Sequence, residues 1–380
     1  MMRIAVVCHV RHPIRPPFMG GMEAHSWHLV RALRARGHDV TLFAAGDSDP
    51  DLTPRPILAR HYDADFPWHD HHGTQALNRH VDEAFAMTAR DLLEGGFDVI
   101  HNNSLHRYLP RLARQFALPT VTSLHVPPFD ALHRAVLESA APWSRFTTTS
   151  ARQVESWWPD GAPESAHVVH NGIDIDAFPF VSEGDGSAVW AGRITPNKGT
   201  HFAVTAAQFT GVPLTIYGVI EHQDYFDRMI RPYLNDRIRY GGHLNGADLA
   251  AAVGRASVFL FTPLWDEPFG LAAVEAMSCG VPVAAIDMGA VREVVGDDAG
   301  RFAPPNQPAA LGLAMKRAMK IDRRIPRQRV EERFALDRMV DGYEAAYRAA
   351  RNGVGTAAPD VAFPPIELTV APRTPALAAE

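Results

Sequence analysis

The chain has 380 residues, a length that predicts two or three domains and enough sequence to bury a substantial core. Hydrophobic residues make up 46% and charged residues 21%, which excludes a wholly disordered or collagen-like chain, and no apolar stretch approaches the ~20 residues of a membrane span. The net charge of −6 argues against a nucleic-acid partner held by a global positive field, and two cysteines, Cys8 and Cys279, fit a reducing cytoplasm.

Apolar runs alternate with helix-like segments from the start of the chain. Residues 4–10 form too short an apolar run for a signal peptide and predict a first strand. Apolar residues at helical spacing follow from Met22 to Leu33, and Gly37 is expected to end that helix. Further strands are predicted at residues 39–43, 98–100, 120–124, 146–149 and 168–169. This alternation indicates a parallel sheet with helices on both faces.

The pattern pauses at a loop over residues 174–186 and then begins again. Strands are predicted at residues 188–191, 214–217, 258–261 and 281–284. The expected fold class is therefore α/β, with two Rossmann-like, doubly wound domains facing across a cleft that holds the ligand. The expected parts are residues 1–175, residues 186–335, a helix over 336–351 that crosses back to the first domain, and a disordered tail over 352–380.

The strongest local signal for a binding site is the segment Asp266–Gly280. A buried strand ends just before it, and a helix is expected to begin around Gly270 and to end at Gly280. The free N–H groups at such a helix start, those of Phe269, Gly270 and Leu271, form a seat for an anion such as phosphate.

Two glutamates accompany this helix. Glu267 stands beside the anion seat, where it could bind a sugar hydroxyl. The spacing places Glu275 on the inward face of an otherwise apolar helix, where a carboxylate is costly unless ligand hydroxyls or other donors satisfy it. The alternative is that Glu267 caps the helix and Glu275 pairs with a core arginine.

Two cations follow the first strand of the second half. Arg193 and Lys198 lie on the loop Gly192–Gly199, which leads into a helix. Arginine offers a bidentate fork and lysine a mobile point charge, a pair suited to a diphosphate. The alternative is that both are solvated loop cations.

A pair of glycines occupies a similar place in the first half. Gly20 and Gly21 precede a helix, so the backbone could approach an anionic ligand closely. The spacing Gly-x-Gly-x-x-Gly is absent, which disfavours a nicotinamide enzyme. A plain turn is the alternative.

His125 directly follows a predicted strand and should face the same cleft. Histidine there suits proton handling or polar recognition, although a purely structural histidine is equally open. Residues 171–174 read as a turn into the interdomain linker.

Three further polar clusters favour solvated surfaces. The consecutive residues of His69–His72 cannot all point at one metal ion. The basic residues of Lys316–Arg329, and the set Arg107, Arg111 and Arg114, could meet anionic lipid or an acidic acceptor, but solvated faces are favoured.

Taken together, these motifs resemble the family 4 glycosyltransferases, retaining sugar-nucleotide enzymes of the GT-B fold. The resemblance covers roughly residues 3–345 and is most specific at Glu267–Gly280, which resembles that family's signature of two glutamates separated by seven residues. It implies that Glu267 contacts the donor sugar and that Glu275 contacts the ribose.

The resemblance also implies roles for the other motifs. Arg193 and Lys198 would hold the diphosphate, and His125 matches a family histidine near the donor sugar and acceptor. Leu244 lies where the family's base-binding loop usually lies, whereas Val219 replaces a common second glycine, so that loop stays unassigned. The implied catalytic residues are His125, Arg193, Lys198 and Glu267. The implied donor-binding residues are Gly20, Gly21, Arg193, Lys198, Leu244, Glu267, Phe269, Gly270, Leu271 and Glu275.

The implied activity is retaining transfer of a sugar from a UDP- or GDP-linked donor to an unidentified acceptor hydroxyl. A metal-independent, same-face route is expected, in which the leaving phosphate takes the acceptor's proton. A GT-B sugar-nucleotide 2-epimerase and a non-catalytic nucleotide-sugar-binding protein remain alternatives. No cofactor and no nucleic-acid partner are expected, and membrane contact is at most peripheral.

Overall fold

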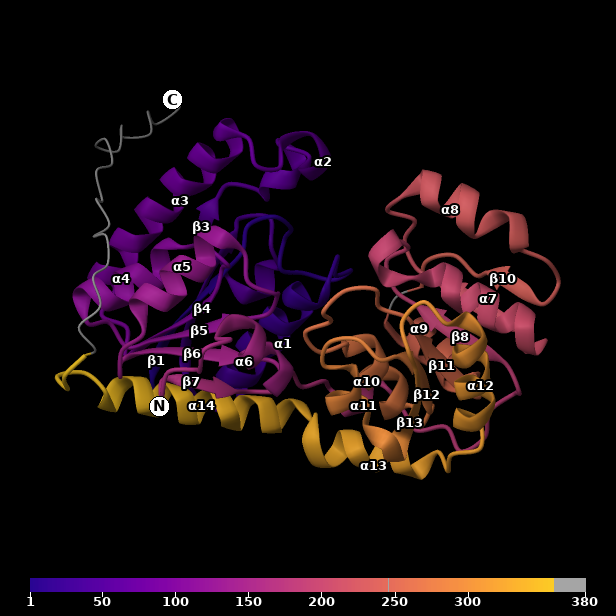
Figure 1. Ribbon diagram of the computed structural model, residues 1–380. Helices are drawn as coiled ribbons and strands as arrows, with labels where there is room; N and C mark the ends of the chain where they lie inside the picture. The colour runs from indigo at the N-terminus through magenta and orange to yellow at the C-terminus, as the bar shows by residue number, and fades with distance from the viewer. Residues whose placement is uncertain (245, 359–380) are drawn as a thin grey trace.

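The computed structural model describes residues 1–244 and 246–358, which form two α/β domains (Figure 1). The first domain contains one parallel sheet in the order β3-β2-β1-β4-β5-β6-β7. Its strands are β1 (Arg3–Cys8), β2 (Asp39–Ala45), β3 (Arg55–Leu58), β4 (Val99–Asn103), β5 (Thr120–Leu124), β6 (Ser144–Thr148) and β7 (Ala166–Val168). Its helices are α1 (Gly21–Ala35), α2 (Trp68–His71), α3 (Gln75–Glu94), α4 (Tyr108–Phe116), α5 (Asp130–Ser139) and α6 (Ala151–Trp157).

The second domain repeats this plan with the order β10-β9-β8-β11-β12-β13, again all parallel. Its strands are β8 (Ala188–Ala191), β9 (Leu214–Tyr217), β10 (Ile238–Tyr240), β11 (Val258–Phe261), β12 (Val283–Ile286) and β13 (Gly300–Ala303). Its helices are α7 (Thr200–Thr210), α8 (Gln223–Met229), α9 (Gly246–Arg255), α10 (Leu271–Ser278), α11 (Val291–Ala299), α12 (Pro308–Ala318) and α13 (Arg324–Arg333). Short 3₁₀ helices are η1 (Pro50–Leu52), η2 (Tyr62–Ala64), η3 (Ile175–Ala177), η4 (Pro196–Lys198) and η5 (Arg231–Tyr233).

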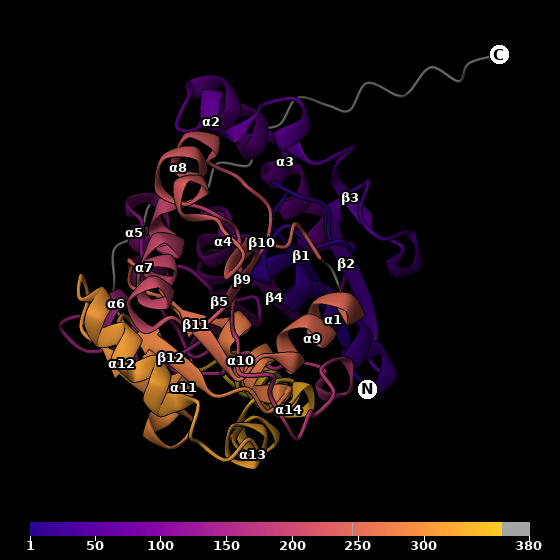
Figure 2. The same cartoon turned by 90° about the vertical axis from the view of Figure 1, so that its right-hand side faces the viewer.

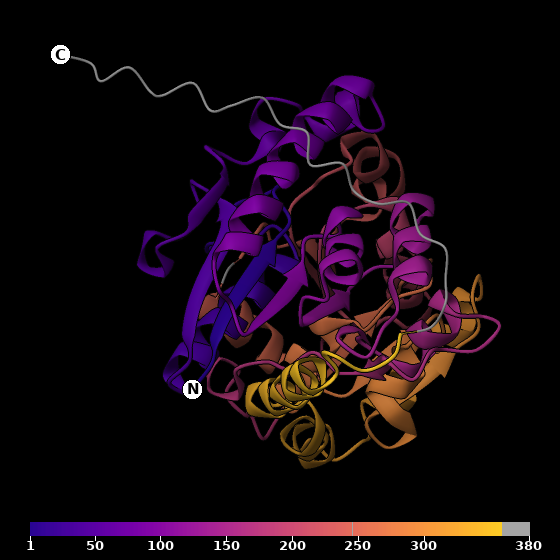
Figure 3. The ribbon, with the colours of Figure 1, turned by 90° about the vertical axis from the view of Figure 1, so that its left-hand side faces the viewer.

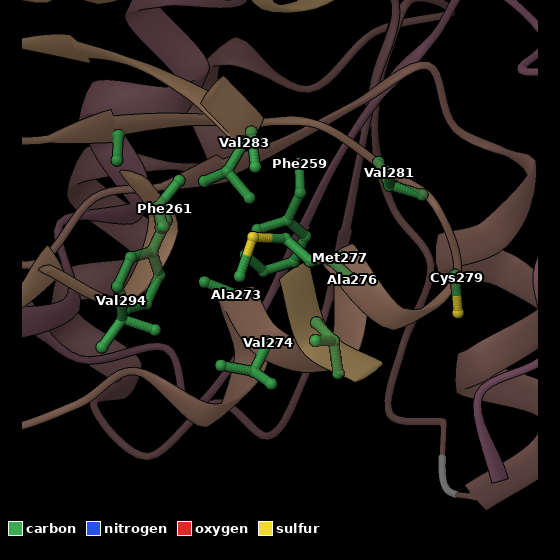
Figure 4. Packing of buried hydrophobic residues seen from close by; sticks show 14 of the residues in the cluster. Phe259, Phe261, Ala273, Val274, Ala276, Met277, Cys279, Val281, Val283 and Val294 are labelled. Carbon is green, nitrogen blue, oxygen red and sulfur yellow. The ribbon is translucent and has the colours of Figure 1, made fainter. Parts of the chain in front are cut away.

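The central strands are apolar on both sides because helices cover both faces of each sheet. In β1, Ile4 and Val6 pack in one cluster with α1, while Ala5 and Val7 pack in another with α3 and α4. The second sheet is built the same way: α10 lies against the face that carries Phe259 (Figure 4), and α7 and α12 lie side by side on the opposite face (Figure 2). The prediction of two doubly wound parallel sheets is confirmed.

The last helix, α14 (Leu336–Asn352), belongs to the first domain in space although it follows the second in sequence (Figures 1 and 3). Its buried side chains include Met339, Val340, Tyr343 and Tyr347, which pack with β1, β2 and α1. A hydrogen-bonded turn follows the helix as far as Thr356, and the remainder of the expected tail, residues 359–380, lies outside the described residues.

The chain crosses between the domains twice, and the two crossings pair with each other. The Ile173 N–H donates to the Phe334 carbonyl at 2.9 Å, and the Leu336 N–H donates to the Ile173 carbonyl at 2.9 Å. A Cβ on Gly172 would lie 2.8 Å from the Ala335 carbonyl oxygen, so the close approach requires glycine. The predicted linker turn is thus part of a paired crossing.

Three strands were not predicted from the sequence: β3, β10 and β13. No helix within the described residues combines the length and the apolar character that crossing a membrane requires.

Candidate functional site

Lys198 and Glu267 meet where two loops of the second domain approach the first domain. Lys198 ends η4 after β8, and its Nζ lies 2.8 Å from Glu267 Oε2, on the loop between β11 and α10. Trp265 Nε1 donates to the same oxygen at 2.8 Å, and the Lys198 ammonium lies 5.0 Å from the centre of the Trp265 ring. Glu267 is only 6% exposed, so these two donors satisfy a carboxylate that would otherwise be costly to bury. Lys198 is thus ion-paired and does not fit the reading of a solvated loop cation.

The helix start next to Glu267 is shaped for close approach of a ligand to the backbone. Gly270 has φ 95°, and a Cβ there would lie 2.8 Å from the Phe261 ring, so glycine is required. The N–H groups of Phe269, Gly270 and Leu271 donate to no described residue, and no side chain caps α10. The alternative in which Glu267 caps this helix is therefore wrong.

The glycine pair of the first domain faces this helix start directly. A Cβ on Gly21 would lie 2.8 Å from Leu271 Cδ1, so the N-terminal ends of α1 and α10 meet across the domain boundary. The Phe269 side chain turns away from this point. It is 3% exposed, and its ring centre lies 5.4 Å from that of Phe334. Only the Phe269 backbone is available to a ligand there.

Arg193 is not part of the Lys198–Glu267 contact. Its Nη1 donates to Glu221 Oε2 at 2.7 Å, and its side chain is 45% exposed. Glu221 follows β9 on the loop that the sequence left unassigned. That loop pairs with the Arg193 loop, since the Ile194 N–H donates to the Val219 carbonyl at 2.8 Å. Arg193 is therefore paired with a carboxylate at about the same distance as Lys198 is.

Glu275 is the one glutamate of the predicted site whose carboxyl group has no hydrogen-bond or ion-pair partner among the described residues. Burial raises the pKa of its carboxyl group to about 7, although the residue keeps some solvent contact. A carboxylate in this position gains most from a donor that a ligand brings, such as a ribose hydroxyl. The described residues form no ion pair between Glu275 and a core arginine, in contrast to that alternative.

His125 lies at the end of β5 inside the first domain. Its Nε2 lies 3.1 Å from Asn103 Oδ1, and its ring centre lies 4.4 Å from that of His25. Burial, followed by the charges of His101 and His9, lowers the pKa of His125 to about 3. The imidazole is therefore neutral near pH 7. No described contact joins it to a residue of the second domain.

A buried carboxylate next to Gly20 was missed. Glu23 in the first turn of α1 is 4% exposed, and its Oε1 lies 3.3 Å from His9 Nε2. A Cβ on Gly20 would lie 3.0 Å from Glu23 Oε2. Burial alone would raise the pKa of Glu23, but the adjacent His9 ring and its charge lower it to about 2. The sequence signal was present, because Glu23 lies two residues after the glycine pair, but its partner His9 lies at the other end of the loop, directly after β1.

Glu293 of α11 makes one set of contacts between the domains. Its carboxylate accepts from the Ala151 N–H at 2.9 Å, the Arg152 N–H at 3.2 Å and His170 Nε2 at 3.0 Å. The first two are free N–H groups at the start of α6, which favour an anion. Burial opposes ionisation, yet the His170 bond and the two amides lower the pKa of Glu293.

A second set of interdomain contacts lies beside Glu267. Asp266 accepts from Arg152 Nε at 3.2 Å and from Ser156 Oγ at 2.7 Å, and the Thr149 hydroxyl donates to the Pro268 carbonyl at 3.0 Å. The loop that carries Glu267 is thus positioned by both domains.

The remaining predicted residues fall outside this group. Leu244 is half-buried on the loop between β10 and α9, next to residue 245, which lies outside the described residues. His69 of α2 lies 5.6 Å, ring centre to ring centre, from His222 before α8, and the described residues contain no group of three potential ligands arranged for a metal ion. Arg107 and Arg111 pair with acids on neighbouring helices, Asp82 and Glu138.

The interpretation of Lys316–Arg329 as a solvated face is wrong for three of its arginines. Arg323 donates to the Val181, Gly254 and Ala256 carbonyls, each at 2.7 Å. Arg327 and Arg329 likewise donate to backbone carbonyls, of Phe178 and Ser278 and of Glu293 and Val294. These guanidinium groups stabilise the ends of helices and the linker, a role that needs tertiary contacts to recognise.

Comparison with known proteins assigns both domains. The family model described as "Glycosyltransferase Family 4" matches residues 19–177, and that described as "Glycosyl transferases group 1" matches residues 174–334. The two matches overlap where the chain leaves the first domain, so together they span both sheets.

Three individual proteins illustrate the similarity. The chain is 26% identical over 345 residues to a phosphatidyl-myo-inositol mannosyltransferase of Mycobacterium leprae, covering 84% of this chain and 88% of the relative. It is 27% identical over 390 residues to a glycogen synthase of Mycobacterium tuberculosis, covering 89% and 93%. A crystal structure of Anabaena HepE in complex with UDP and glucose has a TM-score of 0.71 at 18% identity, covering 92% of this chain and 100% of that one.

The two facing parallel sheets, the helix that returns to the first domain and the family matches all agree on one assignment. The chain belongs to the GT-B glycosyltransferases of the group 1 family.

Proposed function

We propose that this protein transfers a sugar from a nucleoside-diphosphate sugar, UDP- or GDP-linked, to an acceptor hydroxyl with retention of configuration. The observation that carries the proposal is the 2.8 Å contact of Lys198 Nζ with Glu267 Oε2 beside the uncapped start of α10. It joins a cation, a carboxylate and free backbone donors, the three groups that a sugar diphosphate needs.

The diphosphate is bound at the start of α10. Lys198 and the N–H groups of Phe269, Gly270 and Leu271 bind its oxygens, since a helix N-terminus and a lysine both favour an anion. Arg193 exchanges its Glu221 partner for a phosphate oxygen, which its 45% exposed side chain can do without disturbing the core. Glu267 and Glu275 accept hydrogen bonds from the donor sugar and the ribose.

The chemical step breaks the bond between the anomeric carbon and the diphosphate oxygen. Negative charge then develops on the leaving diphosphate, and the two cations and the helix start stabilise it without help from a metal ion. The acceptor oxygen attacks the same face of the sugar and gives its proton to the leaving phosphate. Retention follows from this route without an enzyme nucleophile.

The relatives suggest which donors to test first. HepE holds UDP and glucose, and the mycobacterial relative is a mannosyltransferase. The glucose and mannose derivatives of UDP and GDP are therefore the starting panel. The acceptor is to be found by screening hydroxyl-bearing compounds, with phosphatidylinositol and α-glucans among them.

The direct test is a thermal shift of the wild type and two variants with UDP and GDP. A ligand that binds only the folded protein raises its stability in proportion to the logarithm of ligand over dissociation constant. We expect one of the two nucleotides to stabilise the wild type, and a shift at least halved in Lys198→Ala and Arg193→Ala. Turnover of the intact donor by the wild type should persist in EDTA.

Lys320→Ala and Arg231→Ala are matched controls, because these second-domain side chains lie outside the proposed site and Arg231 pairs with an exposed Asp227. They should retain the full nucleotide shift. Equal shifts in all five proteins would contradict the assigned cations. Epimerised sugar formed from donor alone would indicate a 2-epimerase instead, and binding without turnover across the acceptor panel would indicate a binding protein.

A further inference from the structure

A buried polar cluster connects the last helix of the chain to His125. Its members come from α1, β4, β5 and the residue directly after it, β6 and α14, and none is more than 8% exposed. They are His25, His101, Asn103, Ser123, His125, Thr147, Tyr343 and Tyr347. So many polar groups can be buried without a large free-energy cost only when each of them has a hydrogen-bond partner, and this requirement determines which atoms carry the protons.

The hydroxyl of Tyr347 fixes the first proton of this cluster. Its hydroxyl is fully buried, lies 2.7 Å from His101 Nδ1 and bonds no other described residue. A buried hydroxyl hydrogen without an acceptor costs more than an unused lone pair, so the Tyr347 O–H donates to Nδ1. Burial lowers the pKa of His101 to about 4, against a smaller opposing effect of Asn103. His101 is therefore neutral and carries its only ring proton on Nε2.

Asn103 passes this assignment on to His125. Its Oδ1 lies 2.8 Å from His101 Nε2 and 3.1 Å from His125 Nε2. Because His101 Nε2 carries a hydrogen, the amide atom that faces both rings must be the oxygen, and the nitrogen then donates to Ser26 Oγ at 3.2 Å. An amide oxygen only accepts hydrogen bonds, so His125 Nε2 also carries its hydrogen.

The free atom of His125 is then Nδ1, with an unshared lone pair. It bonds no described residue and is absent from the fully buried polar atoms that lack a partner, so it keeps some exposure. Because the ring is neutral, this nitrogen can accept a hydrogen bond but cannot donate one. It therefore suits a sugar hydroxyl rather than a phosphate oxygen.

We propose that Tyr347 and Asn103 are positioning residues that hold His125 in the Nε2–H tautomer, so that its Nδ1 accepts a hydrogen bond from a substrate hydroxyl. The hydroxyl belongs to the donor sugar or to the acceptor, and this part rests on the proposed glycosyl transfer. The relay means that a side chain near the end of the sequence sets the hydrogen-bonding character of a residue that precedes it by more than two hundred positions.

The test begins with the tautomer itself, which needs no ligand. Long-range ¹H–¹⁵N correlation spectra of the full chain with ¹⁵N-labelled histidine distinguish a protonated from a bare ring nitrogen, and the His125→Ala spectrum identifies the His125 signals. We expect the wild type to show a protonated Nε2 and a bare Nδ1 at both His101 and His125. A protonated Nδ1 on His125 would overturn the proposal whether or not any sugar nucleotide binds.

The variant Tyr347→Phe removes only the hydroxyl that starts the relay. His101 Nδ1 then has no donor facing it, and only the contacts of Nε2 with Asn103 and Ser123 still favour a proton on Nε2. We therefore expect a population with a protonated Nδ1 to appear at His101 and, through Asn103, at His125, and a roughly tenfold loss of donor turnover, the effect of about one hydrogen bond. Tyr225→Phe is the matched control, because its hydroxyl also lies 2.7 Å from a histidine Nδ1, that of His201 in the second domain. It should leave the His125 signals and the turnover unchanged.

Two outcomes distinguish which hydroxyl donates a hydrogen bond to His125. If it belongs to the donor sugar, Tyr347→Phe loses the extra thermal stabilisation that UDP-glucose or GDP-mannose gives over the free nucleotide. If it belongs to the acceptor, that stabilisation is kept, KM for the acceptor rises and donor hydrolysis in water is unchanged. Unchanged tautomers and unchanged turnover in Tyr347→Phe would refute the relay, and failure of every sugar nucleotide to bind the wild type would refute the proposed function alone.

Discussion

At the scale of single residues, burial makes the ionised form of the Glu275 carboxyl group unfavourable. Its folded-state pKa is about 7, above the ordinary value of 4.5, because burial disfavours the charge. The unfolded chain loses this proton as the pH rises past 4.5, whereas the folded protein keeps it until about 7. Glu275 therefore costs nothing at low pH, and its cost grows between these values and is complete above pH 7.

Glu275→Gln should remove this cost. Each pKa unit corresponds to about 1.4 kcal/mol, and because the residue keeps some solvent contact we expect a gain of about 1–2 kcal/mol in the free energy of unfolding at pH 8 and almost none at pH 4.5. Urea unfolding at the two pH values measures the difference. The same variant should bind UDP or GDP more weakly, since a ribose hydroxyl loses its carboxylate acceptor. A gain that does not depend on pH would show that the carboxylate is not strained by burial.

Glu267 differs from Glu275 because protein donors already satisfy it. Lys198 and Trp265 both bond its Oε2. The proposed roles, Glu267 at the donor sugar and Glu275 at the ribose, would therefore begin from different electrostatic states. In the proposed complex Glu267 would share its donors with the ligand, and Glu275 would gain a donor that it lacks.

At the scale of elements, one side chain holds the start of α6. The Glu293 carboxylate accepts the Ala151 and Arg152 N–H groups and also pairs with His170. These contacts join α11 of the second domain to α6 and to the segment after β7. The Ala290 N–H, just before α11, donates to the Glu267 carbonyl at 2.8 Å, so α11 connects this joint to the loop that carries Glu267.

Glu293→Ala should loosen this joint. Loss of an acceptor that serves three donors should lower the free energy of unfolding by about 1–3 kcal/mol and speed amide hydrogen exchange at Ala151 and Arg152. Glu155→Ala is the matched control, because Glu155 pairs with Arg152 from a side chain that is 72% exposed, and such pairs contribute about 0–1 kcal/mol. Equal exchange at the α6 amides in both variants would mean that Glu293 does not hold the helix.

The sequence predicts the central elements better than the edges of the sheets, for a physical reason. Central strands are covered on both faces and read as continuous apolar runs. The three missed strands, β3, β10 and β13, lie at sheet edges and have three or four residues each. β3 is half exposed and contains Pro56, so no hydrophobic pattern marks it.

The candidate site shows the same division between local and tertiary information. Lys198, Glu267 and Gly270 were found because each lies at the junction of a strand and a helix, which is visible locally. Glu293 and Tyr347 were not found, since each acts through partners more than a hundred positions away in the sequence. Their contacts form only when segments that are distant in the sequence have folded against each other.

At the scale of the whole molecule, α14 completes the core of the first domain. Met339, Val340, Tyr343 and Tyr347 are each at most 2% exposed and pack with residues of β1, β2 and α1. Burial of a large apolar side chain contributes about 1.5–3 kcal/mol, so these four together contribute on the order of 6–12 kcal/mol. That is comparable with the whole stability of a typical domain.

Ending the chain after Ala335 should therefore unfold the first domain. We expect an insoluble product or loss of its cooperative thermal transition, measured by calorimetry and circular dichroism. A chain that ends after Ala358 keeps every described contact of α14 and should melt like the full-length protein. An unchanged melting profile after removal of α14 would contradict its place in the core.

The paired crossings at Ile173 and Ala335 have a consequence for engineering. Both peptide junctions of the second domain lie side by side, so that domain is inserted into the first through a single narrow neck. A nucleotide-binding half from another member of the family could be spliced in at these two points with little rebuilding of the seam. Such hybrids would separate the choice of activated sugar from the choice of molecule that receives it.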